Sequence, residues 1–88
     1  MTSPDDGPRV RVLTRAGCHL CDEAIIVVRD VCWTVGASFD TLDIDAADDP
    51  SLLATYSDQV PVIFVDGSIH DFWRVDAERL TKSLTRLR

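Results

Sequence analysis

Positive charge is scarce in this chain of 88 residues, which carries nine Lys and Arg against fifteen Asp and Glu and a formal net charge of -6. This balance repels nucleic-acid phosphates and anionic membrane surfaces, so we expect neither as a partner. No apolar run approaches the length of a membrane span. The first seven residues also lack the cationic and apolar regions of a secretory signal. We therefore expect a soluble, cytoplasmic protein.

Cysteine is sparse as well, and its three residues are an odd number. A secreted scaffold held by disulfides is not expected, because a hydrophobic content of 45% suffices for a core without them. The length allows one core and not two. We expect residues 1–8, which are polar, to form a flexible tail, and residues 9–88 to form one monomeric domain with a single site.

Hydrophobic patterns along the chain predict seven elements in the order β-α-β-α-β-β-α. The strands are expected at residues 10–13, 39–45, 60–65 and 68–72, and the helices at residues 19–35, around 50–56 and from 77 onward. Asp49 and Asp76 are suited to cap the second and third helices, and Asp66-Gly67 is typical of a hairpin turn. With a right-handed crossover between parallel strands, the result is a four-stranded mixed sheet.

The helix at residues 19–35 is predicted against the local preference of one stretch. Residues 25–28 (IIVV) are β-branched and alone favour a strand, because such side chains are stiff at χ1. The helical spacing of the apolar residues, the length of the segment and the acidic first turn at Asp22 and Glu23 favour a helix instead. Gly36 is a suitable stop for it.

Residues 18–21 (CHLC) place two cysteines at the predicted start of this helix. A helix N-terminus has unsatisfied N–H groups and a partial positive charge, which stabilise a thiolate on Cys18 over its thiol. Cys18 is therefore the expected nucleophile. Cys21 lies one turn later, is expected to be less exposed, and would resolve the mixed disulfide that Cys18 forms.

A Cys-X-X-Cys pair is also half of a zinc site, so metal binding is an alternative. The nearest further ligands are His19 and His70. The sequence contains no second Cys-X-X-Cys motif and no pair of histidines at ligand spacing, so we favour redox chemistry. The five aspartates at residues 40–49 alternate along a strand edge and do not converge on one ion. Cys32 lies about 16 Å beyond Cys21 along the helix, and we expect a buried structural thiol there.

Three segments in this order resemble the glutaredoxins of the thioredoxin superfamily. They are residues 13–21 (LTRAGCHLC), 42–45 (LDID) and 59–67 (QVPVIFVDG). The resemblance covers most of residues 9–72 and is greatest to the small bacterial glutaredoxin-like proteins. It implies a thioredoxin-like α/β fold, a three-layer α/β/α sandwich, with thiol–disulfide exchange by the two cysteines of the motif.

The resemblance also implies a substrate site. Pro61 would follow a cis peptide bond and face the redox pair, and the backbone of Val60 would pair with an extended substrate or with glutathione. A trans bond is the commoner state of an X-Pro bond, but the motif context favours cis. Arg15 would lie beside the nucleophile, stabilise the thiolate and contact a carboxylate. The alternative for Arg15 is a solvated loop charge.

The chain departs from the family pattern before its last helix, where glutaredoxins have a Gly-Gly pair that approaches the γ-glutamyl group of glutathione. Here residues 72–75 (FWRV) precede Asp76, which alone keeps the pattern, as a cap and a ligand contact. Phe72 and Trp73 either cover the core or touch a substrate. The motif also lacks its usual proline, and a protonated His19 would make the disulfide more oxidising.

The expected function is that of an oxidoreductase that reduces or exchanges disulfides of proteins or of small thiols. A reductase or glutathione would donate the electrons. No bound cofactor is expected, and the missing glycine pair counts against glutathione as co-substrate. The alternative is a binding module of the same fold that holds a metal or an iron–sulfur cluster, or docks a protein, without redox turnover.

Overall fold

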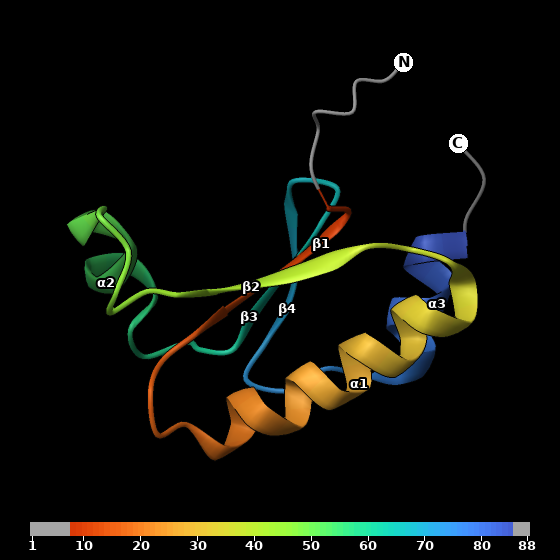
Figure 1. Ribbon diagram of the computed structural model, residues 1–88, viewed down its shortest axis with the longest axis horizontal. Coiled ribbons are helices and arrows are strands. Elements are labelled where there is room, and N and C mark those ends of the chain that lie inside the picture. The colour runs from red at the N-terminus through yellow and green to blue at the C-terminus, as the bar shows by residue number, and fades with distance from the viewer. Residues whose placement is uncertain (1–7, 86–88) are drawn as a thin grey trace.

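The computed structural model describes residues 8–85, which form four strands and three helices (Figure 1). In chain order they are β1 (Val10–Thr14), α1 (His19–Val35), β2 (Phe39–Asp43), α2 (Pro50–Tyr56), β3 (Val62–Val65), β4 (Ser68–Phe72) and α3 (Ala77–Thr85). The predicted order of elements is confirmed. Residues 1–7 of the predicted tail and residues 86–88 of the predicted domain lie outside the described residues.

The strands form one mixed sheet in the order β2-β1-β3-β4. β1 is parallel to β2 and antiparallel to β3, and β3 is antiparallel to β4. The turn between β3 and β4 is Asp66-Gly67, with φ of 51° and 88°, the left-handed geometry that a tight hairpin requires. Since β1 and β2 are parallel, the loops that follow them leave the sheet at the same edge. The cysteine motif begins in the first of these loops.

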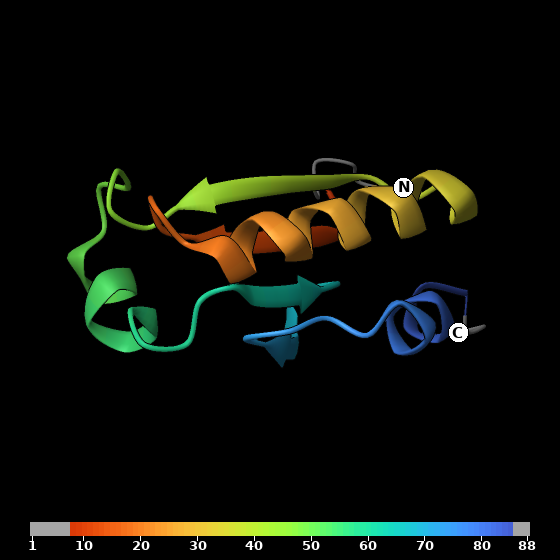
Figure 2. The same ribbon diagram turned by 90° about the horizontal axis from the view of Figure 1, so that it is seen from below.

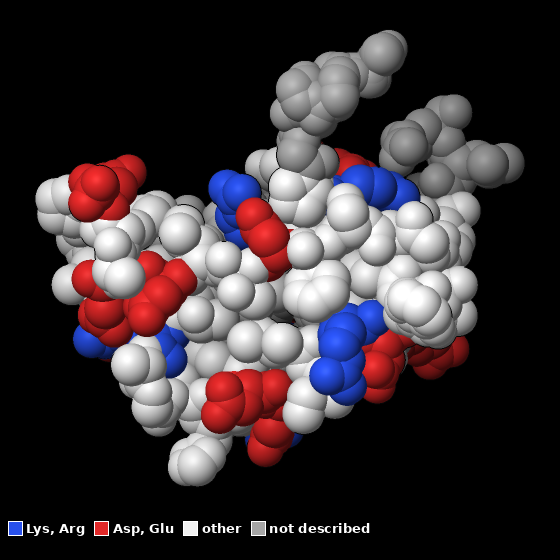
Figure 3. Space-filling model, viewed as in Figure 1, with Lys and Arg blue, Asp and Glu red and all other residues white. Residues whose placement is uncertain are grey.

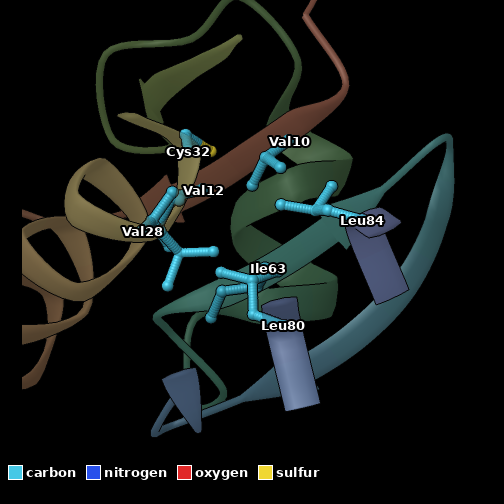
Figure 4. Packing of buried hydrophobic residues seen from close by; sticks show 8 residues of the cluster. Val10, Val12, Val28, Cys32, Ile63, Leu80 and Leu84 are labelled. Atoms are coloured by element: carbon cyan, nitrogen blue, oxygen red, sulfur yellow. The ribbon is translucent and has the colours of Figure 1, made fainter. Parts of the chain in front are cut away.

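Helices α1 and α3 lie side by side on one face of the sheet, as Figure 2 shows from below. Val10 and Val12, at alternate positions of β1, are fully buried on this face together with Ile63 of β3. They interdigitate with helical side chains in Figure 4: Val28, Cys32, Leu80 and Leu84. Each buried valine, isoleucine or leucine side chain stabilises the fold by about 1.5–3 kcal/mol. The β-branched stretch of α1 is thus helical because its buried face joins this core.

The opposite face of the sheet is covered in part by α2. Leu13, Ile44 and Val62 are buried there, and residues of α2 pack against them: Leu52, Leu53 and Tyr56. Tyr56 also meets Phe64 edge-on, with ring centroids 6.1 Å apart. A hollow of about 410 Å³ remains on this face, lined in part by α2 and β1. Apolar clusters on both faces confirm the predicted three layers.

Polar residues and glycine set the ends of the helices as predicted. Asp49 caps α2 by accepting the N–H of Ser51 at 3.0 Å, and Pro50 occupies the first turn. Gly36 ends α1 in the left-handed conformation, at φ 77°. Its N–H and that of Ala37 both donate to the Cys32 carbonyl, so the last turn of α1 is satisfied.

Two strands are shorter than predicted. β2 ends at Asp43 and not at residue 45, because the Asp43 carboxylate accepts the N–H of Asp45 at 2.9 Å and turns the chain. β3 begins at Val62 and not at residue 60, because Pro61 has no N–H to donate to a sheet ladder. Both differences leave the predicted order of the elements unchanged.

Arg9 joins three segments that are far apart in the sequence. Its Nε and Nη2 donate to the two carboxylate oxygens of Asp66 at 3.0 and 2.9 Å. Its Nη1 donates to the carbonyl of Leu84 at 3.1 Å. Its own carbonyl accepts the N–H of Asp66 at 2.8 Å. The start of β1, the hairpin turn and the end of α3 are therefore held together at one place.

The surface carries arginines paired with aspartates, and in Figure 3 blue side chains lie beside red ones. The pairs are Arg9–Asp66, Arg11–Asp40, Arg15–Asp45, Arg29–Asp30 and Arg79–Asp71. Such exposed pairs contribute about 0–1 kcal/mol each. Among the arginines of residues 8–85, only Arg74 has no carboxylate partner. Nor does this part of the chain contain a helix long and apolar enough to span a membrane.

Candidate functional site

Cys18 is the N-cap of α1, as the sequence predicted. Gly17, at φ 75°, makes the sharp turn that brings the chain from β1 to this position. The Cys18 Sγ then accepts a hydrogen bond from the backbone N–H of Cys21 at 3.1 Å. The sulfur therefore occupies the place of a capping oxygen, at the positive end of a helix of 17 residues, where negative charge is stabilised.

Cys21 differs sharply from Cys18 in its surroundings. It is 2% exposed, whereas Cys18 is partly exposed, so the predicted order of exposure is confirmed. Burial, together with a side-chain hydrogen bond to Cys18, raises the pKa of Cys21 to about 12. A backbone hydrogen bond from Arg15 opposes this shift in pKa. Cys21 is thus a protonated thiol at neutral pH, next to a more accessible sulfur.

The peptide bond between Val60 and Pro61 is cis, as the resemblance implied. Pro61 is buried, and its carbonyl accepts the N–H of Trp73 at 2.8 Å. Within residues 8–85, neither the N–H nor the carbonyl of Val60 has a hydrogen-bond partner. These two groups are consequently free to pair with an extended chain.

Arg15 already has a carboxylate partner on its own chain. Its Nε and Nη2 donate to the two oxygens of Asp45, both at 3.1 Å. These hydrogen bonds raise the pKa of Arg15. The pairing follows from the parallel strands, because Arg15 comes just after β1 and Asp45 just after β2. A substrate carboxylate would have to compete with Asp45 for this guanidinium.

Asp76 caps α3, as predicted. One of its carboxylate oxygens accepts the N–H groups of Glu78 and Arg79 at 2.9 and 3.2 Å. Its carbonyl accepts the N–H of Leu80. The first turn of α3 is fixed by these bonds, and the role of Asp76 as a ligand contact stays a prediction.

The sequence left two roles open for Trp73, that of a core residue and that of a substrate contact. The structure places it at the surface beside the cis-proline. It is 53% exposed, with φ 68°, which is unusual for any residue but glycine. Its indole N–H donates to the Asp58 carbonyl at 2.9 Å, and its ring meets Phe72 edge-on. The sequence offered one signal for this conformation. The glutaredoxins that it resembles have a Gly-Gly pair in the same segment, and glycine accepts a positive φ.

A cavity of about 210 Å³ lies next to the motif and was not predicted. On one side it is lined by α1, with Leu20 from between the two cysteines, Glu23, Ala24 and Val27. On the other side it is lined by residues 73–75. The cavity therefore lies next to the cysteine pair through Leu20, and next to the cis-proline segment through Trp73.

The remaining candidates for chemistry are Cys32, His19 and His70, of which only His19 lies within the motif. Cys32 is 1% exposed in the core, where burial raises its pKa, and the prediction of a buried thiol is confirmed. His19 is exposed, and His70 turns toward α3, with Nδ1 3.3 Å from the Ser83 Oγ. Among the residues described, no three His, Cys, Asp or Glu side chains gather in a group that could hold a metal ion.

The chain is similar to known proteins over most of its length. Residues 9–85 match the family described as glutaredoxin-like domain. An uncharacterised protein of Mycobacterium tuberculosis is 35% identical over 82 residues, which cover 90% of this chain and 84% of that protein.

Solved structures give the same picture. The X-ray structure of a structural-genomics target protein from X. campestris has a TM-score of 0.70 at 31% identity, covering 90% of this chain and 99% of that one. A mutant thioredoxin from Halobacterium salinarum has a TM-score of 0.60 at 23% identity, covering 90% and 75% of the two chains, and agrees in fold.

Proposed function

Since the chain belongs to the glutaredoxin-like domain family, we propose that it is a thiol–disulfide oxidoreductase with Cys18 as nucleophile and Cys21 as resolving thiol. The observation that carries the proposal is the unequal environment of two sulfurs at one helix start. Cys18 is accessible and accepts an N–H bond, whereas Cys21 is buried and protonated, with its pKa raised to about 12. The accessible sulfur is the better nucleophile at neutral pH.

The proposed cycle moves two electrons to the substrate. The Cys18 thiolate attacks one sulfur of a substrate disulfide, a bond forms between them, and the other substrate sulfur leaves as a thiolate and takes up a proton. The Cys21 thiol then gives its proton to the substrate sulfur that is still bonded to Cys18, as that sulfur leaves. Cys21 attacks Cys18 in this step and closes the Cys18–Cys21 disulfide. The substrate ends as two thiols.

The unpaired backbone groups of Val60 support a role in holding the substrate. An extended segment that carries the disulfide would pair with them and present its sulfur to Cys18, with Pro61 as the adjoining surface. A reductase or glutathione in the cytoplasm would then reopen the Cys18–Cys21 disulfide and complete an electron-transport step.

The test is a redox titration of the purified protein in thiol buffers, with alkylation and mass spectrometry to count free thiols at each potential. We expect a reversible two-electron couple between Cys18 and Cys21 at about -180 to -280 mV. A potential below about -300 mV, or no couple at all, would contradict an exchange catalyst.

Two variants make the assignment of roles specific. Cys18→Ser should abolish reduction of a model disulfide. The matched control, Cys32→Ala, should keep the couple because Cys32 is buried in the core between α1 and the sheet. Parent activity in Cys18→Ser would refute the proposed nucleophile.

A further inference from the structure

The cavity beside the motif has no part in the exchange of electrons described above. Its α1 side presents three apolar residues, Leu20, Ala24 and Val27, and Leu20 lies between the two cysteines. Its other side includes Trp73 and Val75. At about 210 Å³ it is smaller than the roughly 300–1,000 Å³ of sites for whole small molecules. Its size suits one side chain of a larger ligand.

The wall formed by Trp73 is fixed before any ligand arrives. The backbone N–H of Trp73 donates to the Pro61 carbonyl at 2.8 Å, and its indole N–H donates to the Asp58 carbonyl at 2.9 Å. Its backbone has a φ of 68°, which a tryptophan keeps only where its surroundings hold it. The same residue thus connects the cis-proline segment to the cavity.

The charges at the cavity do not favour an anionic ligand. Glu23 and Arg74 both line it, and neither side chain has an ion pair or a hydrogen bond with another described residue. Their opposite charges offset one another. The other basic residue near the motif, Arg15, is held by both oxygens of Asp45. Glutathione, which carries two carboxylates, would meet the carboxylate of Glu23 here as well as the guanidinium of Arg74, so its negative charge gains no net attraction.

Resting on the proposed function, we propose that this cavity receives an apolar side chain of a protein substrate, from a residue next to the disulfide cysteine that Cys18 attacks. The site then prefers protein disulfides to glutathione disulfide. The cavity adjoins the reacting sulfur through Leu20, and an extended substrate paired with Val60 would run past Trp73 toward it. Apolar walls and a charge-balanced rim select a neutral, apolar residue over a charged one.

The experiment uses three probes with the same leaving group, 2-nitro-5-thiobenzoate. Two are decapeptides whose single cysteine is flanked by Leu in one and by Ser in the other, and the third is glutathione. Attack by Cys18 on the probe sulfur forms a mixed disulfide and releases the coloured thiolate, so stopped-flow absorbance reports this step alone. We expect the Leu peptide to react about tenfold faster than the Ser peptide and the glutathione probe.

Two variants alter the cavity in different ways. Val27→Phe narrows it, and Trp73→Gly removes a wall at a position whose positive φ suits glycine. Each should remove the preference, so that the Leu peptide reacts no faster than the Ser peptide on the same variant. Trp33→Ala is the matched control, because Trp33 is also on the surface, 88% exposed, and does not line the cavity.

The outcomes separate this inference from the proposed function. Equal rates for the two peptides, or a faster glutathione probe, would overturn the apolar pocket while the exchange reaction stands. Release of no thiolate from any probe would instead contradict the exchange reaction. Should either variant fail to fold by circular dichroism, the ratio of the three probes on the parent protein still decides.

Discussion

Alkylation of Cys21 as a function of pH measures how strongly the fold protects this thiol. In a Cys18→Ser, Cys32→Ala variant, Cys21 is the one cysteine left of the three in the sequence. A pKa of about 12, against the ordinary value of 9.0, lowers its thiolate fraction near neutrality by about 10³. Only the thiolate reacts, so the rate with iodoacetamide should be lower than that of an ordinary thiol by a factor of up to about a thousand.

Burial is the largest cause of the raised pKa and remains in this variant, whereas the smaller contributions of the Cys18 thiol are removed. The serine hydroxyl can still accept the Cys21 N–H as an N-cap. The rate should therefore rise about tenfold per pH unit from pH 7 to 10 without a plateau. The same variant unfolded in urea is the control, with a plateau above pH 9. A plateau near pH 9 in the folded protein would refute the reasoning that burial protects Cys21.

Three further predictions concern stability. Burial lowers the pKa of His70, the charge of Arg79 also lowers it, and the charges of Asp71 and Asp76 oppose this shift. The unfolded chain therefore binds the proton at a higher pH than the folded chain does. The free energy of unfolding should accordingly fall as the pH drops below 6.5. His70→Gln should flatten this part of a pH series of thermal melts, whereas the exposed His19→Gln should not. Leu80→Ala, at a side chain with no exposed surface, should cost about 2–5 kcal/mol in urea unfolding; a loss below about 1 kcal/mol would contradict the packing around it. Asp76→Ala should cost about 1 kcal/mol through the lost cap of α3, and an unchanged midpoint would show that the cap is dispensable.

The fold was largely predictable because local signals and burial agree. Gly36, Asp49 and the Asp66-Gly67 turn each act through the chain's own nearest neighbours, so the sequence alone places them. The stretch at residues 25–28 was the exception, since its β-branched residues oppose the helix. The period of the buried face decided it, and Val28 is buried while Ile26 is half exposed.

The site was predictable only where its geometry is local. Cys18 and Cys21 meet within one helical turn, so their unequal exposure follows from the start of α1. The pairing of Arg15 with Asp45 depends on the ends of two parallel strands, and Trp73 depends on the Asp58 and Pro61 carbonyls. Such contacts join segments that no periodicity relates, and the cavity that Trp73 lines was therefore not predicted.

The guanidinium of Arg9 brings the first strand and the last helix to one point, with Arg9 and Leu84 bonded although they are 75 positions apart. Segments whose two ends meet in this way can be carried as an insert within a surface loop of another protein, because both junctions fall at the same place. They can equally be joined end to end and opened at a different loop. The start of α1 lies at the far end of β1 from Arg9, so a circularly permuted chain joined here would keep the cysteine pair unaltered.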